Sequence, residues 1–465
     1  MFDRYLPSIV QIASTLLIAR LLDPREFGEV ALVTVFIQIA SLLIASGFAE
    51  ALIYRGKNSD VLYSTVFYIN VLFALIFYTL LYLFSNKIAV FYRISNLEFL
   101  SKVVGINIIL YSLTYIQRVF YSIAQNYRTP ALVVFISTII GSTLGIILAL
   151  NNFGVWALVF QTLLINLIQV VLFWYLSSWK PILAFSYLEL KSILPFSLKI
   201  LTNNIIQVFY ENFYTLVIGK AFSSTILGFY NRMQTILFFS TTNLMYALES
   251  VYYPKLCIRK NDNIHLVQSY EIISRLTSYF GFPILVVMIV LGEPIITIIL
   301  TKNWLGGLLI LKLLSVAYLF VPITYLNNSF LKIVNKTNLL FYSNIFRKLL
   351  GVSIVLIAIK YSINVVLYGI ILYNAIDAII SMFITQKILG INIIKQFSFL
   401  INNILLNICF FFVLFNVSSY FNSNILKVFF SLTLGVFVYL IVPIILKFKE
   451  MVIIKNIIGR EEKNI

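Results

Sequence analysis

Apolar runs of about 20 residues recur along the whole sequence, separated by short polar or turn-forming breaks. A helix needs a run of this length to cross a membrane, whereas a membrane β-barrel would show alternating segments of about ten residues. Hydrophobic residues make up 61% of the chain and charged residues 11%, whereas soluble domains are roughly half apolar and a quarter charged. The sequence therefore predicts an all-α polytopic membrane protein.

The breaks between the apolar runs divide the chain into fourteen predicted transmembrane helices. Turn residues mark several of them, as at Asp23-Pro24 and Gly306-Gly307. The loops are too short to hold a soluble catalytic domain. The predicted spans are 5–22, 29–49, 62–84, 99–123, 130–150, 154–176, 195–219, 226–250, 272–299, 306–328, 338–359, 364–388, 397–416 and 425–446.

A segment near the N-terminus recurs in the middle of the chain. In both copies a basic residue ends an apolar run, and a glycine follows it eight positions later. We interpret the pair as a duplicated helical hairpin, a plan typical of transporters. The matching positions are Thr15 and Thr215, Ile18 and Ile218, Arg20 and Lys220, and Gly28 and Gly228.

The duplication predicts a division of the chain into two lobes. Each lobe would contain six spans, and the longest segment between spans would join them. The predicted parts are an N-terminal lobe at 1–176, an inter-lobe linker at 177–194, a C-terminal lobe at 195–388, two extra spans within 389–446 and a basic cytoplasmic tail at 447–465.

The distribution of basic residues predicts the orientation of the chain. The net charge is +17, and most Lys and Arg residues fall on the side that holds both termini. Positively charged loops stay in the cytoplasm, so both termini are expected there, and the charge does not point to nucleic acid. The two cysteines form no CxxC pair, and His265 is the single histidine. No disulfide framework, metal site or cofactor is therefore expected.

Polar side chains follow one face of the seventh predicted span and continue on the eighth. Polar groups that face lipid are costly, so this stripe is expected to face a cavity. Hydrogen bonding between packed helices stays open as the alternative. The candidate cavity residues are Asn203, Gln207, Tyr210, Asn212, Tyr214 and Asn231.

The charges inside or near the spans are mainly basic. A basic residue at mid-membrane costs about 2.5–3.5 kcal/mol, so it needs a partner, a water-filled cavity or a function. Arg20, Arg118 and Arg232 would suit an anionic substrate, because arginine matches phosphate geometry. Snorkelling to the interface is the alternative for Arg20 and Arg118. Glu211 and Asp377 are candidates for proton or cation coupling, or are partners of basic residues.

The predicted topology separates the three arginines in depth. Arg20 and Arg232 lie toward the outer face and Arg118 toward the cytoplasm. A gating or structural role for Arg20 therefore stays open beside a phosphate contact. The sequence contains no phosphate-binding glycine loop, no paired catalytic carboxylates and no Ser/His/Asp arrangement, so no catalytic residues and no enzymatic activity are expected.

Several segments resemble a known family. They are Ile18-Ala-Arg-Leu-Leu-Asp-Pro-Arg-Glu-Phe-Gly28, Ser46-Gly-Phe-Ala-Glu-Ala-Leu-Ile53, Leu227-Gly-Phe-Tyr-Asn-Arg232, Val251-Tyr-Tyr-Pro-Lys-Leu256 and Lys302-Asn-Trp304. Together they resemble the O-antigen (Wzx-type) polysaccharide flippases of the multidrug/oligosaccharidyl-lipid/polysaccharide exporter superfamily. Two features depart from the family pattern. The segment before the first span looks shortened, and the family's Asn-x-Asp late in the seventh span reads Asn212-Phe-Tyr214 here.

The resemblance implies a MATE-like fold of two pseudo-symmetric six-helix lobes around a cavity, with two extra C-terminal helices. It implies flipping of an undecaprenyl-diphosphate-type lipid-linked oligosaccharide across the bacterial cytoplasmic (inner) membrane, by alternating access, for surface polysaccharide such as lipopolysaccharide O-antigen. The diphosphate would contact Arg20, Arg118 and Arg232, and the polar residues of spans 7 and 8 would contact sugar hydroxyls. A polysaccharide polymerase and glycosyltransferases would be partners.

Two alternatives remain open at this stage. The first is a cation-coupled multidrug exporter of the same superfamily, which predicts acidic cavity residues. The second is a non-transporting membrane scaffold of a polysaccharide assembly complex, which predicts that intramembrane charges are dispensable.

Overall fold

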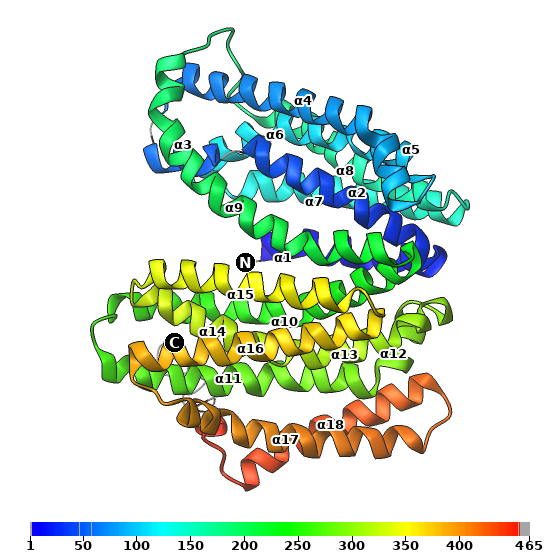
Figure 1. The fold of residues 1–465 in the computed structure, drawn as a ribbon, viewed down its shortest axis with the longest axis vertical. Coiled ribbons are helices and arrows are strands. Elements are labelled where there is room, and N and C mark those ends of the chain that lie inside the picture. The colour runs from blue at the N-terminus through cyan, green and yellow to red at the C-terminus, as the bar shows by residue number, and fades with distance from the viewer. Residues whose placement is uncertain (1, 46, 57, 454, 456–465) are drawn as a thin grey trace. The chain divides into compact units, whose positions relative to one another are not determined.

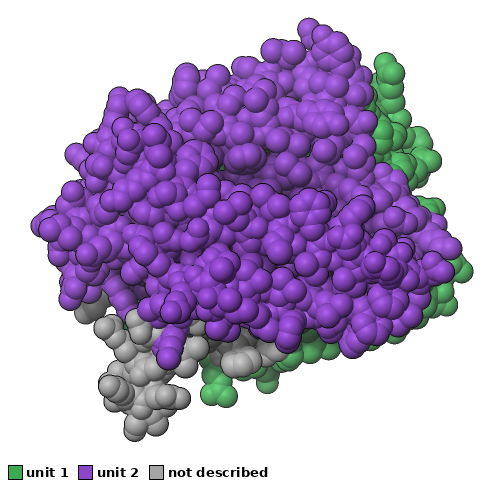
Figure 2. Space-filling view, turned by 90° about the horizontal axis from the view of Figure 1, so that it is seen from below, with its two compact units in different colours: residues 1–231 green, residues 232–465 purple. Residues whose placement is uncertain are grey.

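The computed structural model describes residues 2–45, 47–56, 58–453 and 455, without the side chains of 2–6, 8 and 203 (Figure 1). It divides into two compact units, residues 1–231 (unit 1) and 232–465 (unit 2), coloured separately in Figure 2. The helices of unit 1 are α1 (Phe2–Leu21), α2 (Pro24–Ala45), α3 (Phe48–Arg55), α4 (Asp60–Tyr92), α5 (Leu97–Val104), α6 (Ile106–Ile123), α7 (Arg128–Leu150), α8 (Val155–Leu176) and α9 (Tyr187–Ala221).

The division between the units falls within α10 (Ser224–Ile258). The remaining elements of unit 2 are α11 (Asn263–Val290), α12 (Gly292–Ile299), the 3₁₀ helix η1 (Lys302–Gly307), α13 (Leu308–Tyr318), α14 (Val321–Ile333), α15 (Thr337–Ala358), α16 (Ile363–Leu389), α17 (Ile393–Ser419) and α18 (Asn424–Ile445).

The helical membrane class predicted from the sequence is confirmed. Among the described residues, 11 helical segments are long and apolar enough to cross a membrane. Every predicted span falls on one helix or on successive helices, but three of them are outside this set of 11. These three are α1, whose apolar part is Ile9–Leu21, and the more polar α9 and α10. The total of fourteen crossings therefore stays a prediction.

Local sequence signals explain where several helices begin and end. The hydroxyl of Ser59 accepts a hydrogen bond from the Leu62 N–H at 3.0 Å and caps the start of α4. The Asp262 carboxylate accepts from the His265 N–H at 3.0 Å and caps α11 in the same way. Gly47, between α2 and α3, has a φ of 69°, which glycine adopts without steric cost. A single apolar run is thereby broken into two helices.

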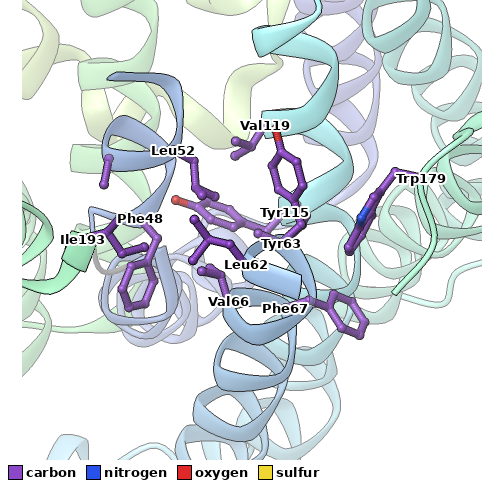
Figure 3. Close-up of a cluster of buried hydrophobic side chains, with 12 residues drawn as sticks. Phe48, Leu52, Leu62, Tyr63, Val66, Phe67, Tyr115, Val119, Trp179 and Ile193 are labelled. Atoms are coloured by element: carbon purple, nitrogen blue, oxygen red, sulfur yellow. The ribbon is translucent and has the colours of Figure 1, made fainter. Parts of the chain in front are cut away.

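The core of unit 1 includes a cluster of side chains from α3, α4, α6, α9 and the segment before α9 (Figure 3). Leu52, Leu62 and Val66 pack against Tyr63 and Tyr115. The Tyr115 hydroxyl donates to the Ala45 carbonyl at 3.2 Å and accepts from the Ala49 N–H at 3.1 Å. One hydroxyl thus satisfies backbone groups on both sides of the break between α2 and α3.

Tyr115→Phe is expected to lower the free energy of unfolding by about 1–3 kcal/mol, because two backbone groups lose their hydrogen-bond partner. Thermal unfolding in detergent, followed by intrinsic fluorescence, measures the change. Tyr127→Phe is the matched control, since Tyr127 is 67% exposed. Equal melting temperatures for the two variants would contradict the bridging role of the Tyr115 hydroxyl.

The helices α2 and α10 approach each other closely at two glycines, both within unit 1. A Cβ atom on Gly28 would lie 1.9 Å from the Ser224 carbonyl oxygen. A Cβ atom on Gly228 would lie 1.8 Å from the Pro24 carbonyl oxygen. These two glycines are the matching glycines of the sequence repeat, and their contacts are reciprocal. Any side chain at either position would separate the two helices.

The predicted linker at 177–194 is only partly irregular. Its second half belongs to α9, which begins at Tyr187. The first half docks on α4, where the Ile182 N–H donates to the Ser64 hydroxyl and the Ser186 N–H donates to the Thr65 hydroxyl, both at 3.0 Å. The helix α9 then packs on α2, α3 and α4 and is part of unit 1. The two compact units therefore divide the chain after residue 231. The predicted lobes, which follow the sequence repeat, divide it at the linker 177–194.

The chain segment after α18 is anchored to α11 by charge pairs. The Arg275 guanidinium donates to the Glu450 carboxylate at 3.2 Å and to Glu271 at 3.1 Å, and Glu450 is completely buried. Lys449 also contacts Glu271, at 3.2 Å. The first described residues of the predicted basic tail are thus bound to unit 2, while residues 456–465 lie outside the described part.

Candidate functional site

Arg118 lies in α6 among neutral groups of unit 1. Its guanidinium donates to the side-chain oxygen of Gln169, and its central carbon lies 5.2 Å from the centre of the Phe173 ring. The Arg118 Nε is buried and has no hydrogen-bond partner in the described structure. No carboxylate of the described residues lies within ion-pair distance of Arg118. The site therefore holds a positive charge that no described acidic residue neutralises.

The amide of the neighbouring Gln117 adds to this polar interior. Gln117 is completely buried, and neither side-chain atom of its amide has a hydrogen-bond partner among the described residues. Buried polar groups are usually paired, and an unpaired one costs about 1–3 kcal/mol. Two adjacent residues of α6, Gln117 and Arg118, thus have buried polar atoms without a hydrogen-bond partner among the described residues.

Arg20 has a different environment from Arg118. It is exposed at the end of α1 and forms no hydrogen bond or ion pair with any described side chain. Its repeat counterpart, Lys220, donates to the Phe91 carbonyl at 2.5 Å and lies 3.8 Å from the centre of the Phe91 ring. Lys220 thus binds a carbonyl at the end of α4, where a positive charge is favourable. The structure does not bring Arg20 into the surroundings of Arg118.

Arg232, the third predicted phosphate contact, is the first residue of unit 2. Its side chain is buried, with 7% of its surface exposed. The guanidinium carbon lies 5.9 Å from the centre of the Trp304 ring in η1, within the range of a cation–π contact. Burial against an indole fixes the side chain near the start of α10.

The polar stripe of α9 divides between two faces of the helix. Gln207 donates to Glu211 at 2.9 Å, and both side chains are exposed. Asn212 is buried and donates to the Val208 carbonyl at 2.9 Å. One residue along a helix is a rotation of about 100°, which explains the different surroundings of neighbours. The glutamate proposed for ion coupling thus shares its exposed face with Gln207.

The remaining residues of the stripe are held by local contacts. The rings of Tyr210 and Tyr214 meet edge to face, with their centres 6.2 Å apart. Thr215 donates to the Asn231 side-chain oxygen at 3.2 Å, which ties α9 to α10. The side chain of Asn203 lies outside the described part of the chain.

Asp377, the other ion-coupling candidate, is paired with a buried arginine. Arg347 in α15 donates to Asp377 in α16 at 2.9 Å and to Asn328 in α14 at 3.0 Å. It also donates to Asn344, one turn earlier in α15. Arg347 is only 2% exposed. Binding of a proton or cation at Asp377 would therefore compete with an internal guanidinium.

The sequence analysis left a basic partner open for Asp377, but it did not identify Arg347 or the two asparagines of this network. A signal was present, because Asn344 and Arg347 are three residues apart and share a helix face. Asn328 and Asp377 lie in the two neighbouring spans. Polar residues at interior positions of three successive spans indicate a buried network, and the arginine is its centre.

Another partly buried acid of unit 2, Glu249, is also paired. The carboxylate of Glu249 in α10 accepts from the Tyr325 hydroxyl and from the Ser329 hydroxyl of α14, the latter at 2.8 Å. Lys332 lies 3.9 Å away. Glu249 and Asp377 are thus both neutralised or hydrogen-bonded, whereas Arg118 is not paired with an acid.

Comparisons with known proteins agree with a membrane protein of polysaccharide synthesis. A family profile described as "Polysaccharide biosynthesis protein" matches residues 17–309. Teichuronic acid biosynthesis protein TuaB of Bacillus subtilis (strain 168) is 21% identical over 337 residues, covering 72% of this chain and 70% of the relative. Lipopolysaccharide biosynthesis protein WzxC of Escherichia coli (strain K12) is 22% identical over 379 residues, covering 80% and 76%.

A solved structure shows the same fold. The lipid II flippase MurJ in an inward closed conformation superimposes with a TM-score of 0.75 at 17% identity, covering 96% of this chain and 98% of MurJ. This likeness confirms the expected all-helical membrane fold, and the relatives confirm the expected link to polysaccharide biosynthesis. Since the family profile covers more than half of the sequence, this multi-pass membrane protein belongs to the polysaccharide biosynthesis protein family.

Proposed function

We propose that the protein flips a polyprenyl-diphosphate-linked oligosaccharide from the cytoplasmic to the outer leaflet of the bacterial cytoplasmic membrane. The family, whose relatives act in teichuronic acid and lipopolysaccharide biosynthesis, supports a role in surface polysaccharide synthesis. The MurJ-like fold supports movement of a lipid-linked molecule. The substrate moves by alternating access, without covalent chemistry.

The observation that carries this proposal is the uncompensated charge of Arg118. Arg118 donates to the neutral Gln169 and has no carboxylate partner among the described residues. A buried guanidinium in a membrane helix is stable only with a partner, water or a ligand. A diphosphate supplies the missing negative charge and can accept two parallel N–H bonds from arginine. Arg232 is proposed as a second contact and Arg20 as a gate or anchor.

The proposed sugar contacts follow from exposure on α9. Gln207 and Glu211 are exposed and carry amide and carboxylate groups that can bind sugar hydroxyls. Asn231, which is partly buried, stays a candidate, as do the two tyrosines of the stripe. We also propose that α1, α9 and α10 cross the membrane, which gives fourteen spans and places both termini in the cytoplasm.

Arg118→Ala is expected to reduce surface polysaccharide at least about tenfold, since a charge-assisted hydrogen bond of about 1.5–3 kcal/mol is lost. The measurement is complementation of a strain from which the protein's own gene is deleted, scored by surface polysaccharide at equal membrane levels of protein. Arg118→Lys is expected to retain part of the function, because the charge remains.

Arg128→Ala is the matched control, since Arg128 is exposed at the start of α7 in the same unit. Full complementation by both Arg118→Ala and Arg232→Ala would refute the proposed cationic site. In that case the scaffold alternative gains support if loop substitutions abolish function. The exporter alternative gains support if deletion instead sensitises cells to cationic drugs.

A further inference from the structure

A groove of about 660 Å³ lies between the end of α10 and the start of α11, within unit 2. It has a cationic end and an apolar end. Lys255, Arg259 and His265 line it beside the turn that joins the two helices. Aliphatic side chains line the part farther from the turn, and they include Leu248, Val251, Ile272 and Leu276.

The length of the groove matches one leaflet of a membrane. From Arg259 back to Leu248 the helix rises roughly 16 Å. One leaflet contributes roughly 15 Å, which is half of a hydrocarbon core of about 30 Å. Two apolar side chains of the groove are open to the surroundings, since Val251 is 58% exposed and Ile272 is 39% exposed. The shape and polarity fit a molecule with a charged head and one extended apolar tail.

The basic side chains at the cationic end of the groove are not neutralised by described acidic residues. Neither Lys255 nor Arg259 forms an ion pair within the described residues. The Nδ1 atom of His265 is buried and has no hydrogen-bond partner among them. Asp262, the acid of the turn, is engaged as the cap of α11 by accepting from the His265 backbone N–H. A lysine and an arginine side by side are suited to a phosphate group.

We propose that this groove binds one anionic phospholipid of the leaflet that faces the basic loops. Its phosphate contacts Lys255 and Arg259, and one acyl chain lies along Val251 and Ile272. Basic pockets between membrane helices are known binding places for anionic headgroups. Apart from the three nitrogen-bearing side chains, the polar lining is limited to Tyr252 and Ser269. An oligosaccharide would need more donors and acceptors, which favours a phospholipid over the transported substrate.

The test measures binding of phosphatidylglycerol and phosphatidylcholine with identical acyl chains to the full chain in detergent, by native mass spectrometry. The wild type is expected to bind phosphatidylglycerol at least about tenfold more tightly, because each basic residue near an anionic headgroup contributes to binding. The double substitution K255Q/R259Q is expected to remove this preference. Ile272→Trp, which fills the apolar end, is expected to weaken binding of both lipids.

The matched control is K260Q/K395Q, which removes the same charge from exposed residues that do not line the groove. It should keep the preference, as should the charge-conserving variant K255R/R259K. Equal binding of both lipids to the wild type, or an unchanged preference in K255Q/R259Q, overturns the proposal. Displacement of the lipid by millimolar inorganic phosphate, or tighter binding of undecaprenyl diphosphate in the groove, overturns it as well.

Discussion

Gly28→Ala is expected to destabilise the protein by at least about 3 kcal/mol, at the upper end of the usual cost of overpacking. The added Cβ would lie 1.9 Å from the Ser224 carbonyl oxygen, and a backbone atom cannot rotate away as a flexible side chain can. The helices α2 and α10 would have to separate. Gly228→Ala should have a similar effect, because its Cβ would meet the Pro24 carbonyl at 1.8 Å. The melting temperature and the yield of monodisperse protein in detergent measure the loss.

Gly281→Ala is the matched control for this experiment. Gly281 also lies inside a helix, but its added Cβ would be 3.7 Å from Met245 and 3.9 Å from Pro322, an ordinary contact distance. The control should be neutral or stabilising by about 0.5–1 kcal/mol. The double variant Gly28→Ala with Gly228→Ala should cost much less than the sum of the single variants, because both separate the same crossing. Wild-type stability of Gly28→Ala would show that the crossing is not tight.

Arg347→Met is expected to destabilise unit 2 by about 3–5 kcal/mol, the usual cost of removing one member of a buried ion pair. Asp377 would be left with its charge in a site that is only 14% exposed, and Asn328 would lose a donor. The double variant Arg347→Met with Asp377→Leu should recover much of the loss, because no charge is left unpaired. Thermal unfolding of the three proteins measures both effects.

Lys102→Gln provides the comparison for the arginine network. Lys102 contacts Glu98 at 2.7 Å, but their side chains are 26% and 36% exposed. Such a solvent-accessible pair is screened by water and contributes little to stability, so this variant should melt close to the wild type. If Arg347→Met melted as close to the wild type as Lys102→Gln does, the pair of Arg347 and Asp377 would not be required for the fold.

Hydropathy predicts most of the membrane helices, because lipid demands long apolar segments wherever the chain crosses. It fails at the polar ends of helices. The prediction for α4 stops at residue 84, whereas the helix continues to Tyr92, and α9 begins at Tyr187 instead of residue 195. It also misses breaks within an apolar run, as at Gly47. Helix ends depend on capping and packing, which leave only a weak trace in composition.

The candidate site is less predictable than the helices, because the type of a residue does not determine which residues surround its side chain in the fold. Arg20 and Arg118 look alike in the sequence, yet Arg20 is exposed and Arg118 is partly buried beside Gln169. Glu211 and Asn212 are adjacent, yet they lie on different faces of α9. These differences arise from contacts between residues far apart in the chain, which periodicity within one helix does not reveal.

The pairing of Arg275 with Glu450 has a consequence for the order in which the chain is made. The two residues are 175 positions apart, so at about 5–20 residues per second Glu450 leaves the ribosome roughly 9–35 s after Arg275. During this interval Glu271, one turn away at 3.1 Å, is the counter-charge available on the same helix. The helix α11 can therefore enter the bilayer with its arginine already neutralised. The final pair forms only after synthesis has passed Glu450.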